Sequence, residues 1–314
     1  MPELPEVEVV RSGFATHCLG KTITNVEVSH PRAIRKIDGG DAVLAYSLVG
    51  TEITQISRRG KFMWFIPTLT QPTETASNDA AAVAHKQKKT SAQGQSIASD
   101  QHAIVVHLGM SGQLRIFEHP HPQPRHGRIK VDFSDGSQLW FIDQRTFGYW
   151  NISELIADPH HIQARIPAQI AHIAPDLLEL SEPGIAAGRI AGKKTQLKRA
   201  LLDQNIVAGI GNIYCDEMLW ATRLHPGMAT EDVGKQQLVE LIANGQAIMR
   251  TAIANGGTSF DDLYVNVNGQ SGYFDLSLHA YGRGGDPCDR CGTIMVRSEF
   301  AGRASVYCPD CQRL

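Results

Sequence analysis

Two pairs of cysteines near the C-terminus constrain the fold of this chain more than any other feature. Cys288 and Cys291 form one C-x2-C pair, Cys308 and Cys311 form a second, and 16 residues separate the pairs. Two such pairs can place four thiolates in a tetrahedron around one zinc ion. The module between them is so short that it needs the metal to fold. A redox-active C-x2-C is disfavoured, because two matched pairs occur and no thioredoxin-like strand-helix-strand pattern precedes them.

The segment between the cysteine pairs, at residues 299–307, is predicted to be a β-hairpin whose turn carries Arg303. A guanidinium projecting from a turn is well suited to binding a phosphate group. Zinc ribbons also serve as purely structural clips, so the metal site alone leaves the function open.

The net charge of the chain does not indicate a nucleic-acid-binding protein that is basic over its whole surface. The 314 residues carry a formal net charge of −2 with a pI near 6.7. Nucleic-acid binding would therefore need a local basic face on an acidic body. The other cysteines, Cys18 and Cys215, are isolated, which favours a metal site in a reducing compartment over a disulfide framework. No apolar run approaches the roughly 20 residues of a membrane helix, and the acidic, proline-broken N-terminus is unlike a signal peptide.

The N-terminus, Met1-Pro2-Glu3, carries the first candidate for covalent chemistry. Removal of Met1 ahead of the small Pro2 would leave a secondary amine as the mature N-terminus. α-Amino groups titrate near pH 8, so about one in ten is neutral at pH 7 and able to attack an electrophilic carbon. Glu3 beside it can deliver or accept a proton. The alternative is an ordinary proline-started helix, whose buried face recurs at helical spacing: Val7, Val10, Phe14 and Cys18.

The rest of the first 150 residues shows the alternation of half-buried strands. Residues 67–102 contain almost no bulky apolar side chains, which predicts a disordered insertion between two strands. The turn Arg58-Arg59-Gly60-Lys61 would deliver Lys61 to the head of a buried strand as a contact for a phosphate or a leaving group. A solvated basic turn is the alternative. Strands are predicted at residues 22–29, 43–48, 52–57, 62–66, 103–108, 113–117, 128–133 and 138–142.

Two loops in this half present side chains suited to a nucleic-acid base. Gly109-Met110-Ser111-Gly112 places Met110 at a loop tip, where a methionine can act as a wedge in a base stack. Arg145 and Phe147 lie on another loop and could hydrogen-bond to bases and stack on them. Each loop taken alone could equally be structural.

The second half of the chain is helical in texture. Residues 151–175 are predicted to be a connector, followed by helices at 193–203 (short and basic), 213–222 and 234–255. The small residues of the glycine-punctuated segment that opens the second helix, together with Asn212, suit close backbone approach to a phosphate. A nucleotide-binding glycine loop is disfavoured, because no G-x-G-x-x-G fingerprint occurs. Residues 256–274 form a polar, glycine-rich loop of the kind that closes over a ligand.

The ordered set of motifs resembles the bacterial formamidopyrimidine-DNA glycosylases, a family of bifunctional DNA repair enzymes. PELPEVE, RRGK, HLGMSG, DQRTFG, GIGNIY and C-x2-C-x16-C-x2-C follow one another over nearly the whole chain except residues 67–102. The resemblance implies an α+β multidomain fold with one structural Zn2+. Its expected parts are a catalytic β-sandwich with an N-terminal helix at 1–150, a helical helix-two-turn-helix domain at 151–275, and a zinc-finger β-hairpin at 276–314.

The resemblance also implies which residues catalyse the reaction. Pro2 would attack C1′ of the damaged nucleoside and expel the base, with Glu3 as the acid and base at the deoxyribose. Lys61 would contact phosphate and assist strand cleavage by β-elimination. Arg303 would grip the lesion phosphate and is linked to δ-elimination.

Further residues are implied as contacts to DNA. Met110, Arg145 and Phe147 would fill the gap left by the flipped-out base, with Arg145 facing the orphaned cytosine. The remaining contacts would be to the DNA backbone, with Asn212 at the lesion phosphate and the others at His126, Lys194, Lys198 and Tyr281.

The implied substrate is double-stranded DNA containing oxidised purines or abasic sites, acted on by a cytoplasmic, nucleoid-associated monomer. The nearest alternative is the related endonuclease VIII type, which uses the same N-terminal proline on oxidised pyrimidines. PELPEVE, Met110 with Arg145 and Phe147, and the long 256–274 loop argue against it. A non-enzymatic zinc-ribbon nucleic-acid binder is the alternative from another class. An inactive homologue is disfavoured because the catalytic candidates are all present.

Overall fold

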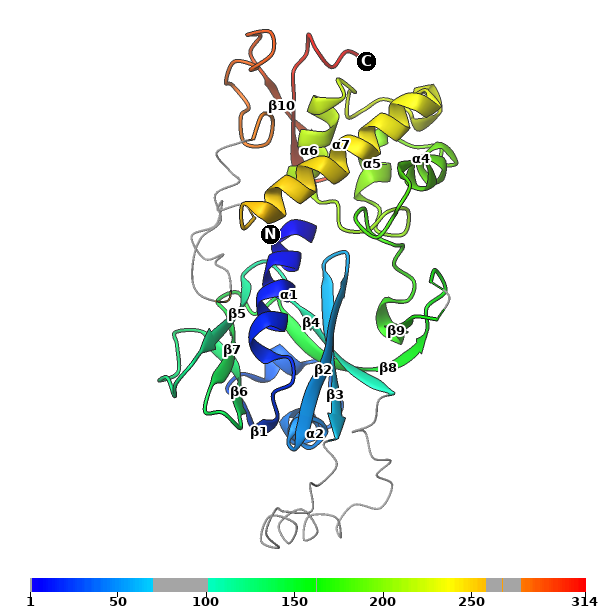
Figure 1. Ribbon diagram of the computed structural model, residues 1–314. Coiled ribbons are helices and arrows are strands. Elements are labelled where there is room, and N and C mark those ends of the chain that lie inside the picture. The colour runs from blue at the N-terminus through cyan, green and yellow to red at the C-terminus, as the bar shows by residue number, and fades with distance from the viewer. Residues whose placement is uncertain (1, 70–100, 162, 258–266, 268–277) are drawn as a thin grey trace, which may run out of the picture.

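The protein is described by a computed structural model that covers residues 2–69, 101–161, 163–257, 267 and 278–314. Figure 1 shows a β-sheet lobe below and a lobe of helices carrying a β-hairpin above. The N-terminal helix α1 (Leu4–Cys18) lies where the two lobes meet. This arrangement confirms the predicted α+β multidomain fold.

Two antiparallel sheets form the lower lobe as a sandwich. One has the strand order β1-β6-β7-β5 and the other the order β2-β3-β4-β8-β9. Apolar side chains of both sheets, such as Phe141 and Phe65, pack in one core together with α1. The strands are β1 (Ile23–Val28), β2 (Thr51–Arg59), β3 (Phe62–Leu69), β4 (His102–His107), β5 (Gly112–Phe117), β6 (Gly127–Phe133), β7 (Gln138–Asp143), β8 (Tyr149–Ala157) and β9 (Arg165–Pro167).

The strand predicted at residues 43–48 is wrong, because this segment belongs to helix α2 (Gly40–Leu48). Asp41 lies in the first turn, where a negative charge is favourable. Leu44 and Leu48 are four residues apart and both fully buried, which is the spacing of one helix face. A short apolar run of this kind is ambiguous between strand and helix from sequence alone.

The connector predicted at residues 151–175 is also wrong in its first part. It contains most of β8, which pairs with β4, and all of β9, which pairs with β8. Pro167 is compatible with strand structure here because β9 is an edge strand.

The predicted insertion at residues 67–102 is shorter at both ends than expected, since β3 extends to Leu69 and β4 begins at His102. Residues 70–100 lie outside the described residues, so the prediction of disorder is not addressed there. The same holds for the predicted ligand-covering loop at 256–274, apart from residues 256, 257 and 267.

The upper lobe is helical as predicted, and we take the helix pair α5 and α6 as the expected helix-two-turn-helix. The basic helix expected at 193–203 is shorter than predicted. The described residues of this lobe form the α-helices α4 (Pro183–Ala191), α5 (Leu197–Leu202), α6 (Asn212–Ala221) and α7 (Lys235–Ala254). Short 3-10 helices lie at Pro31–Ile34, Ala168–Ile170 and Thr230–Asp232 in the described part of the chain. The hairpin of β10 (Val296–Phe300) and β11 (Arg303–Tyr307) rests on α6, where Val306 packs with Trp220 and Cys288.

Helix α1 connects the two lobes through its own side chains. Leu4 packs in the core of the upper lobe, whereas Val7, Val10 and Phe14 pack in the core of the sandwich. The backbone N–H of Leu4 also donates to the carbonyl of Gly209 at 3.2 Å. The residues that precede Leu4 are therefore held at the junction of the lobes.

Candidate active site

Pro2 and Glu3 are both buried at this junction, immediately ahead of α1. Glu3 is only 2% exposed. Its backbone N–H donates to Glu6 Oε2 at 2.9 Å, and the hydroxyl of Tyr214 donates to the other oxygen of Glu6 at 2.7 Å. The start of α1 is thereby fixed to α6, and the position of the N-terminal residues is fixed with it.

The carboxylate of Glu3 lies at the N-terminus of α6. Its oxygens accept the backbone N–H groups of Ile213 at 3.0 Å and Tyr214 at 3.4 Å. The partial positive charge of a helix N-terminus favours an anion at this place. Gly211 permits the approach, because a Cβ there would lie 2.1 Å from the Glu3 Cδ. The glycines of the GIGNIY motif are thus explained by close packing.

This geometry corrects one sequence interpretation. The start of this helix was expected to approach a phosphate with its backbone, but the N–H groups of Ile213 and Tyr214 already bind Glu3. The side chain of Asn212 lies beside them, and its amide nitrogen donates to the carbonyl of Ala304 at 2.8 Å.

Lys61 lies beside this pair at the head of β3. Its Nζ donates to the carbonyl of Ile210 at 3.2 Å. Burial lowers the pKa of Lys61; the nearby Glu3 opposes this fall, and Arg303 adds to it. Burial raises the pKa of Glu3, and the nearby Glu6 adds to this rise, whereas Lys61 and the two backbone donors oppose it. Opposite shifts of this kind bring an acid and a base toward the pH at which both can exchange protons.

The turn that carries Lys61 is not a solvated basic turn. Arg58 donates to Glu8 at 2.9 Å and to Asp176 Oδ2 at 2.5 Å. Both oxygens of Asp176 accept further hydrogen bonds: Oδ2 from the N–H of Gly60 at 2.8 Å, and Oδ1 from the N–H of Leu178. The two arginines of the RRGK motif therefore anchor the turn between the lobes.

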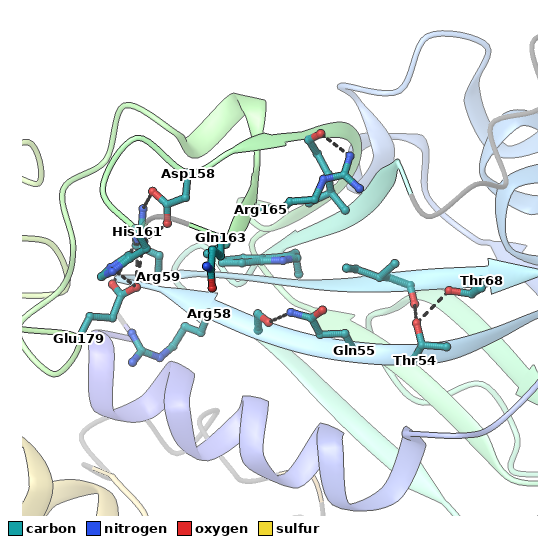
Figure 2. Close-up of a pocket in the computed structure, with 15 residues that line it drawn as sticks. Thr54, Gln55, Arg58, Arg59, Thr68, Asp158, His161, Gln163, Arg165 and Glu179 are labelled. Atoms are coloured by element: carbon teal, nitrogen blue, oxygen red, sulfur yellow. Dashed lines mark hydrogen bonds and ion pairs between the residues drawn. The ribbon is translucent and has the colours of Figure 1, made fainter.

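Arg59 is ion-paired with Asp158 at 2.6 Å and with Glu179 at 3.0 Å. Figure 2 labels these three residues among those that line a pocket. These residues line a cavity of about 570 Å³, which is not lined by Glu3 or Lys61. The candidate catalytic groups therefore lie outside this cavity.

The loops with the predicted base wedge lie together at one end of the sandwich. Met110 is 37% exposed and Phe147 is 45% exposed, so both predicted tips project outward. The guanidinium of Arg145 lies 4.0 Å from the Met110 sulfur. Buried Asp143 holds the two loops together, since it accepts hydrogen bonds from Ser111 Oγ and from the N–H groups of Arg145 and Gly148.

The predicted backbone contacts are placed differently from one another. Lys194 is exposed and precedes α5, and His126 is half-buried next to β7, where its carbonyl accepts the N–H of Asp143. Tyr281 is half-buried, and its N–H donates to Glu217. Lys198, in contrast, is fully buried and ion-paired with Asp216 at 2.6 Å.

Four sulfurs converge as the cysteine spacing predicts. The Sγ atoms of Cys288, Cys291, Cys308 and Cys311 all lie within 4.8 Å of one another. Sulfurs bound to one zinc ion at about 2.3 Å lie about 3.8 Å apart, so the set fits a tetrahedral site. The indole N–H of Trp220 donates to Cys288 Sγ at 3.4 Å, a contact that suits a thiolate. The protein therefore has one structural Zn2+ site.

His107 is a further candidate for a residue of the active site, and it was not predicted from the sequence. Burial lowers its pKa to about 4, helped by Lys36, Lys61 and Arg35. Its ring lies between those of Phe62 and Tyr149, and Nδ1 accepts the N–H of Gly109. The HLGMSG motif contains this histidine, and its position just before the wedge loop was the available signal.

Comparisons with known proteins agree with this geometry. Family models match residues 1–150 as the formamidopyrimidine-DNA glycosylase N-terminal domain, 173–263 as the formamidopyrimidine-DNA glycosylase H2TH domain, and 285–314 as the zinc finger found in FPG and IleRS. The chain belongs to the formamidopyrimidine-DNA glycosylase family. The predicted class, a DNA glycosylase, is thereby confirmed.

Individual relatives cover the whole chain. The formamidopyrimidine-DNA glycosylase of Corynebacterium diphtheriae is 48% identical over 318 residues, covering 99% of each protein. That of Mycobacteroides abscessus is 48% identical over 315 residues, covering 100% of this chain and 99% of the relative. A solved complex of Lactococcus lactis Fpg with DNA containing an abasic site is 27% identical, with a TM-score of 0.76 and full coverage of both chains. A complex of MutM with DNA containing carbocyclic 8-oxo-G is 28% identical, with a TM-score of 0.76 and the same coverage.

Membrane insertion finds no support among the described helices. None of them has both the length and the apolar character needed to cross a bilayer.

Proposed function

We propose that this glycosylase excises oxidised purines, such as 8-oxoguanine and formamidopyrimidines, from duplex DNA and then cleaves the strand. The observation that carries the proposal is the convergence of Pro2, Glu3 and Lys61 at the N-terminus of α6. The solved relatives bound to abasic-site DNA and to 8-oxo-G DNA support this substrate class.

In the proposed first step, the amine of Pro2, freed by removal of Met1, attacks C1′ of the flipped-out nucleoside. The bond to the damaged base breaks, and its electron pair leaves with the base, which takes up a proton. Glu3 exchanges protons with the deoxyribose as the ring opens, and its raised pKa suits that role. The sugar stays attached to Pro2 as an iminium.

The proposed second stage cleaves the strand. Loss of a C2′ proton from the iminium leaves an electron pair that forms a C2′–C3′ double bond and expels the 3′ phosphate. This step is β-elimination. Loss of a further proton expels the 5′ phosphate, which is δ-elimination. Lys61 assists the first elimination, because its lowered pKa makes its neutral form more available, and Arg303 stabilises the phosphate that leaves in the second.

The proposed DNA contacts follow from exposure. Met110, Arg145 and Phe147 fill the space left by the extruded base, and Arg145 faces the orphaned cytosine. Asn212 and Arg303 bind the lesion phosphate, and His126, Lys194 and Tyr281 bind the backbone elsewhere. Such phosphate contacts give affinity without sequence preference, which suits a search for damage. The buried position of Lys198 favours an indirect contribution to this binding.

We further propose that the protein is a cytoplasmic, nucleoid-associated monomer. The three parts of its chain are proposed at 1–150, 151–275 and 276–314. The strand β8 crosses residue 150, so the first boundary lies within the described sheet.

Borohydride trapping on duplex DNA with an abasic site tests the proposed function. We expect a covalent protein–DNA adduct with the wild-type protein, less adduct with Pro2→Gly, which keeps a primary amine, and none when the N-terminal amine is acylated. Absence of the adduct for the wild type contradicts the proposal and favours a non-enzymatic zinc-ribbon binder. Excision of 8-oxoguanine opposite cytosine should exceed excision of thymine glycol; the reverse order would indicate the endonuclease VIII type.

A further inference from the structure

Asp216 and Lys198 form a buried ion pair that the proposed chemistry does not use. Asp216 is 1% exposed, Lys198 is 0% exposed, and the Lys198 Nζ lies 2.6 Å from Asp216 Oδ1. The pair joins α5 to α6. Burial raises the pKa of Asp216, and Lys198 opposes this rise. Lys198 is therefore the counter-charge of this buried carboxylate.

The same carboxylate binds the zinc-finger hairpin. Asp216 Oδ1 accepts the hydroxyl of Ser305 at 3.2 Å, and Oδ2 accepts the backbone N–H of Val306 at 3.1 Å. The carbonyl of Ala304 accepts Lys198 Nζ at 3.5 Å and the amide of Asn212 at 2.8 Å. Three consecutive residues of β11 are thus bound by side chains of the helix-two-turn-helix.

Arg303 is the residue directly before these three. It begins β11 after a tight turn in which Ala301 and Gly302 have φ angles of 49° and 74°. The side chain of Arg303 is exposed. It lies near enough to Lys61 to contribute to the lowering of the lysine pKa. The strand after Arg303 is therefore anchored, while the Arg303 side chain itself is exposed.

We propose that Asp216 is a positioning residue that sets Arg303 over the cleaved phosphate through its bonds to β11. Lys198 neutralises Asp216 and supports the same strand through Ala304. The proposal rests on the proposed role of Arg303 in δ-elimination. Asp216 itself touches no reacting atom, so its removal should affect the second elimination far more than base excision.

Asp216→Asn tests this inference, because asparagine keeps the shape but removes the charge. We expect the ratio of δ- to β-elimination product from abasic-site DNA to fall about tenfold, the effect of one weakened charge-assisted hydrogen bond. The rate of 8-oxoguanine release should stay within about twofold of the wild type. In Arg303→Ala, adding Asp216→Asn should change the product ratio no further, because both changes remove one interaction.

Gln312→Ala is the matched control. Gln312 is equally buried and links Cys308 to the carbonyl of Leu224 after α6, and its hydrogen bonds do not go to residues 304–306. It should leave the product ratio unchanged. If Asp216→Asn is too unstable to assay, Ser305→Ala, which removes one donor without unpairing Lys198, should lower the ratio about twofold.

Two outcomes overturn the inference: an unchanged product ratio in the folded Asp216 or Ser305 variant, or equal losses in base release and δ-elimination. A wild-type protein that gives no β- or δ-product contradicts the proposed function itself, so the two failures are distinguishable.

Discussion

The carboxylate of Glu3 binds the backbone N–H of Ile213 at 3.0 Å, joining the second residue of the candidate catalytic pair to a helix 210 positions away in the chain. The two elements approach so closely because residue 211 is a glycine. This contact fixes the distance between the N-terminus and the helix-two-turn-helix, and it makes a first prediction.

Gly211→Ala should displace Glu3, because the new Cβ would lie 2.1 Å from the Glu3 Cδ. We expect a loss of about 2 kcal/mol in the free energy of unfolding from overpacking, and about a hundredfold loss in base release from misplacement. Gly188→Ala in α4 is the control, because no atom lies within 4 Å of its Cβ position. That change should stabilise the protein by about 1 kcal/mol. Similar behaviour of the two variants in urea unfolding would contradict the packing argument.

Glu3→Gln should abolish base release and yet stabilise the fold at neutral pH. Burial raises the Glu3 pKa above its unfolded value, so ionised Glu3 costs stability above the folded pKa. This cost disappears as the pH falls through the folded pKa toward the unfolded value, where both states are protonated. The stability advantage of the variant should therefore be greatest above the folded pKa of Glu3 and shrink as the pH falls toward 4.5, by about 1.4 kcal/mol for each unit of pKa shift. Urea unfolding between pH 5 and 8 measures it, and a constant difference would count against a raised pKa.

Much of the site could be predicted from sequence because the groups are chemically distinctive. The chemistry of an N-terminal proline beside a glutamate is recognisable from the sequence alone. The same is true of two cysteine pairs with this spacing. The support for these groups could not be predicted, because it depends on tertiary contacts. Arg58 appears in sequence as part of a basic turn, but its partner Asp176 lies 118 residues away.

The errors in fold have the same origin. Residues 43–48 have an apolar pattern that fits a strand or a helix, and burial against the sandwich selects the helix. Lys198 has the spacing of an exposed basic helix face, but Asp216 and the zinc hairpin cover it. Burial by a distant segment leaves no local signal in the sequence.

Asp176→Asn tests whether the RRGK turn is an anchor between the lobes. The change weakens the partner of Arg58, whose side chain is 7% exposed, and breaking a buried pair costs about 3 kcal/mol. We expect lower stability and slower strand cleavage, because the turn carries Lys61. Arg11→Ala, which removes a more exposed pair with Glu8, should cost under about 1 kcal/mol. Equal costs for the two variants in urea unfolding would argue against the anchor.

Zinc removal should abolish δ-elimination by releasing the hairpin that carries Arg303. Cys291→Ser removes one of the four converging sulfurs, and we expect less than one equivalent of zinc per chain in a colorimetric metal assay. Cys18→Ala is the control, since Cys18 is buried in the sandwich core away from the metal ligands. It should retain one equivalent of zinc. Full δ-elimination activity in metal-free Cys291→Ser would show that the hairpin folds without the ion.

The salt dependence of DNA binding distinguishes Lys194 from Lys198, which the family resemblance implies are both contacts to the DNA backbone. The logarithm of the DNA association constant falls linearly with the logarithm of the salt concentration, and removing one lysine that binds a phosphate should reduce this slope by about 0.9. Lys194 is exposed, so Lys194→Ala should show this reduction. Lys198 is buried and neutralised by Asp216, so Lys198→Met should weaken binding with nearly the wild-type slope, since its effect passes through the hairpin. Fluorescence anisotropy at several salt concentrations measures both slopes. A reduction of the slope by about 0.9 for Lys198→Met would mean that Lys198 leaves Asp216 and binds a phosphate directly in the DNA complex.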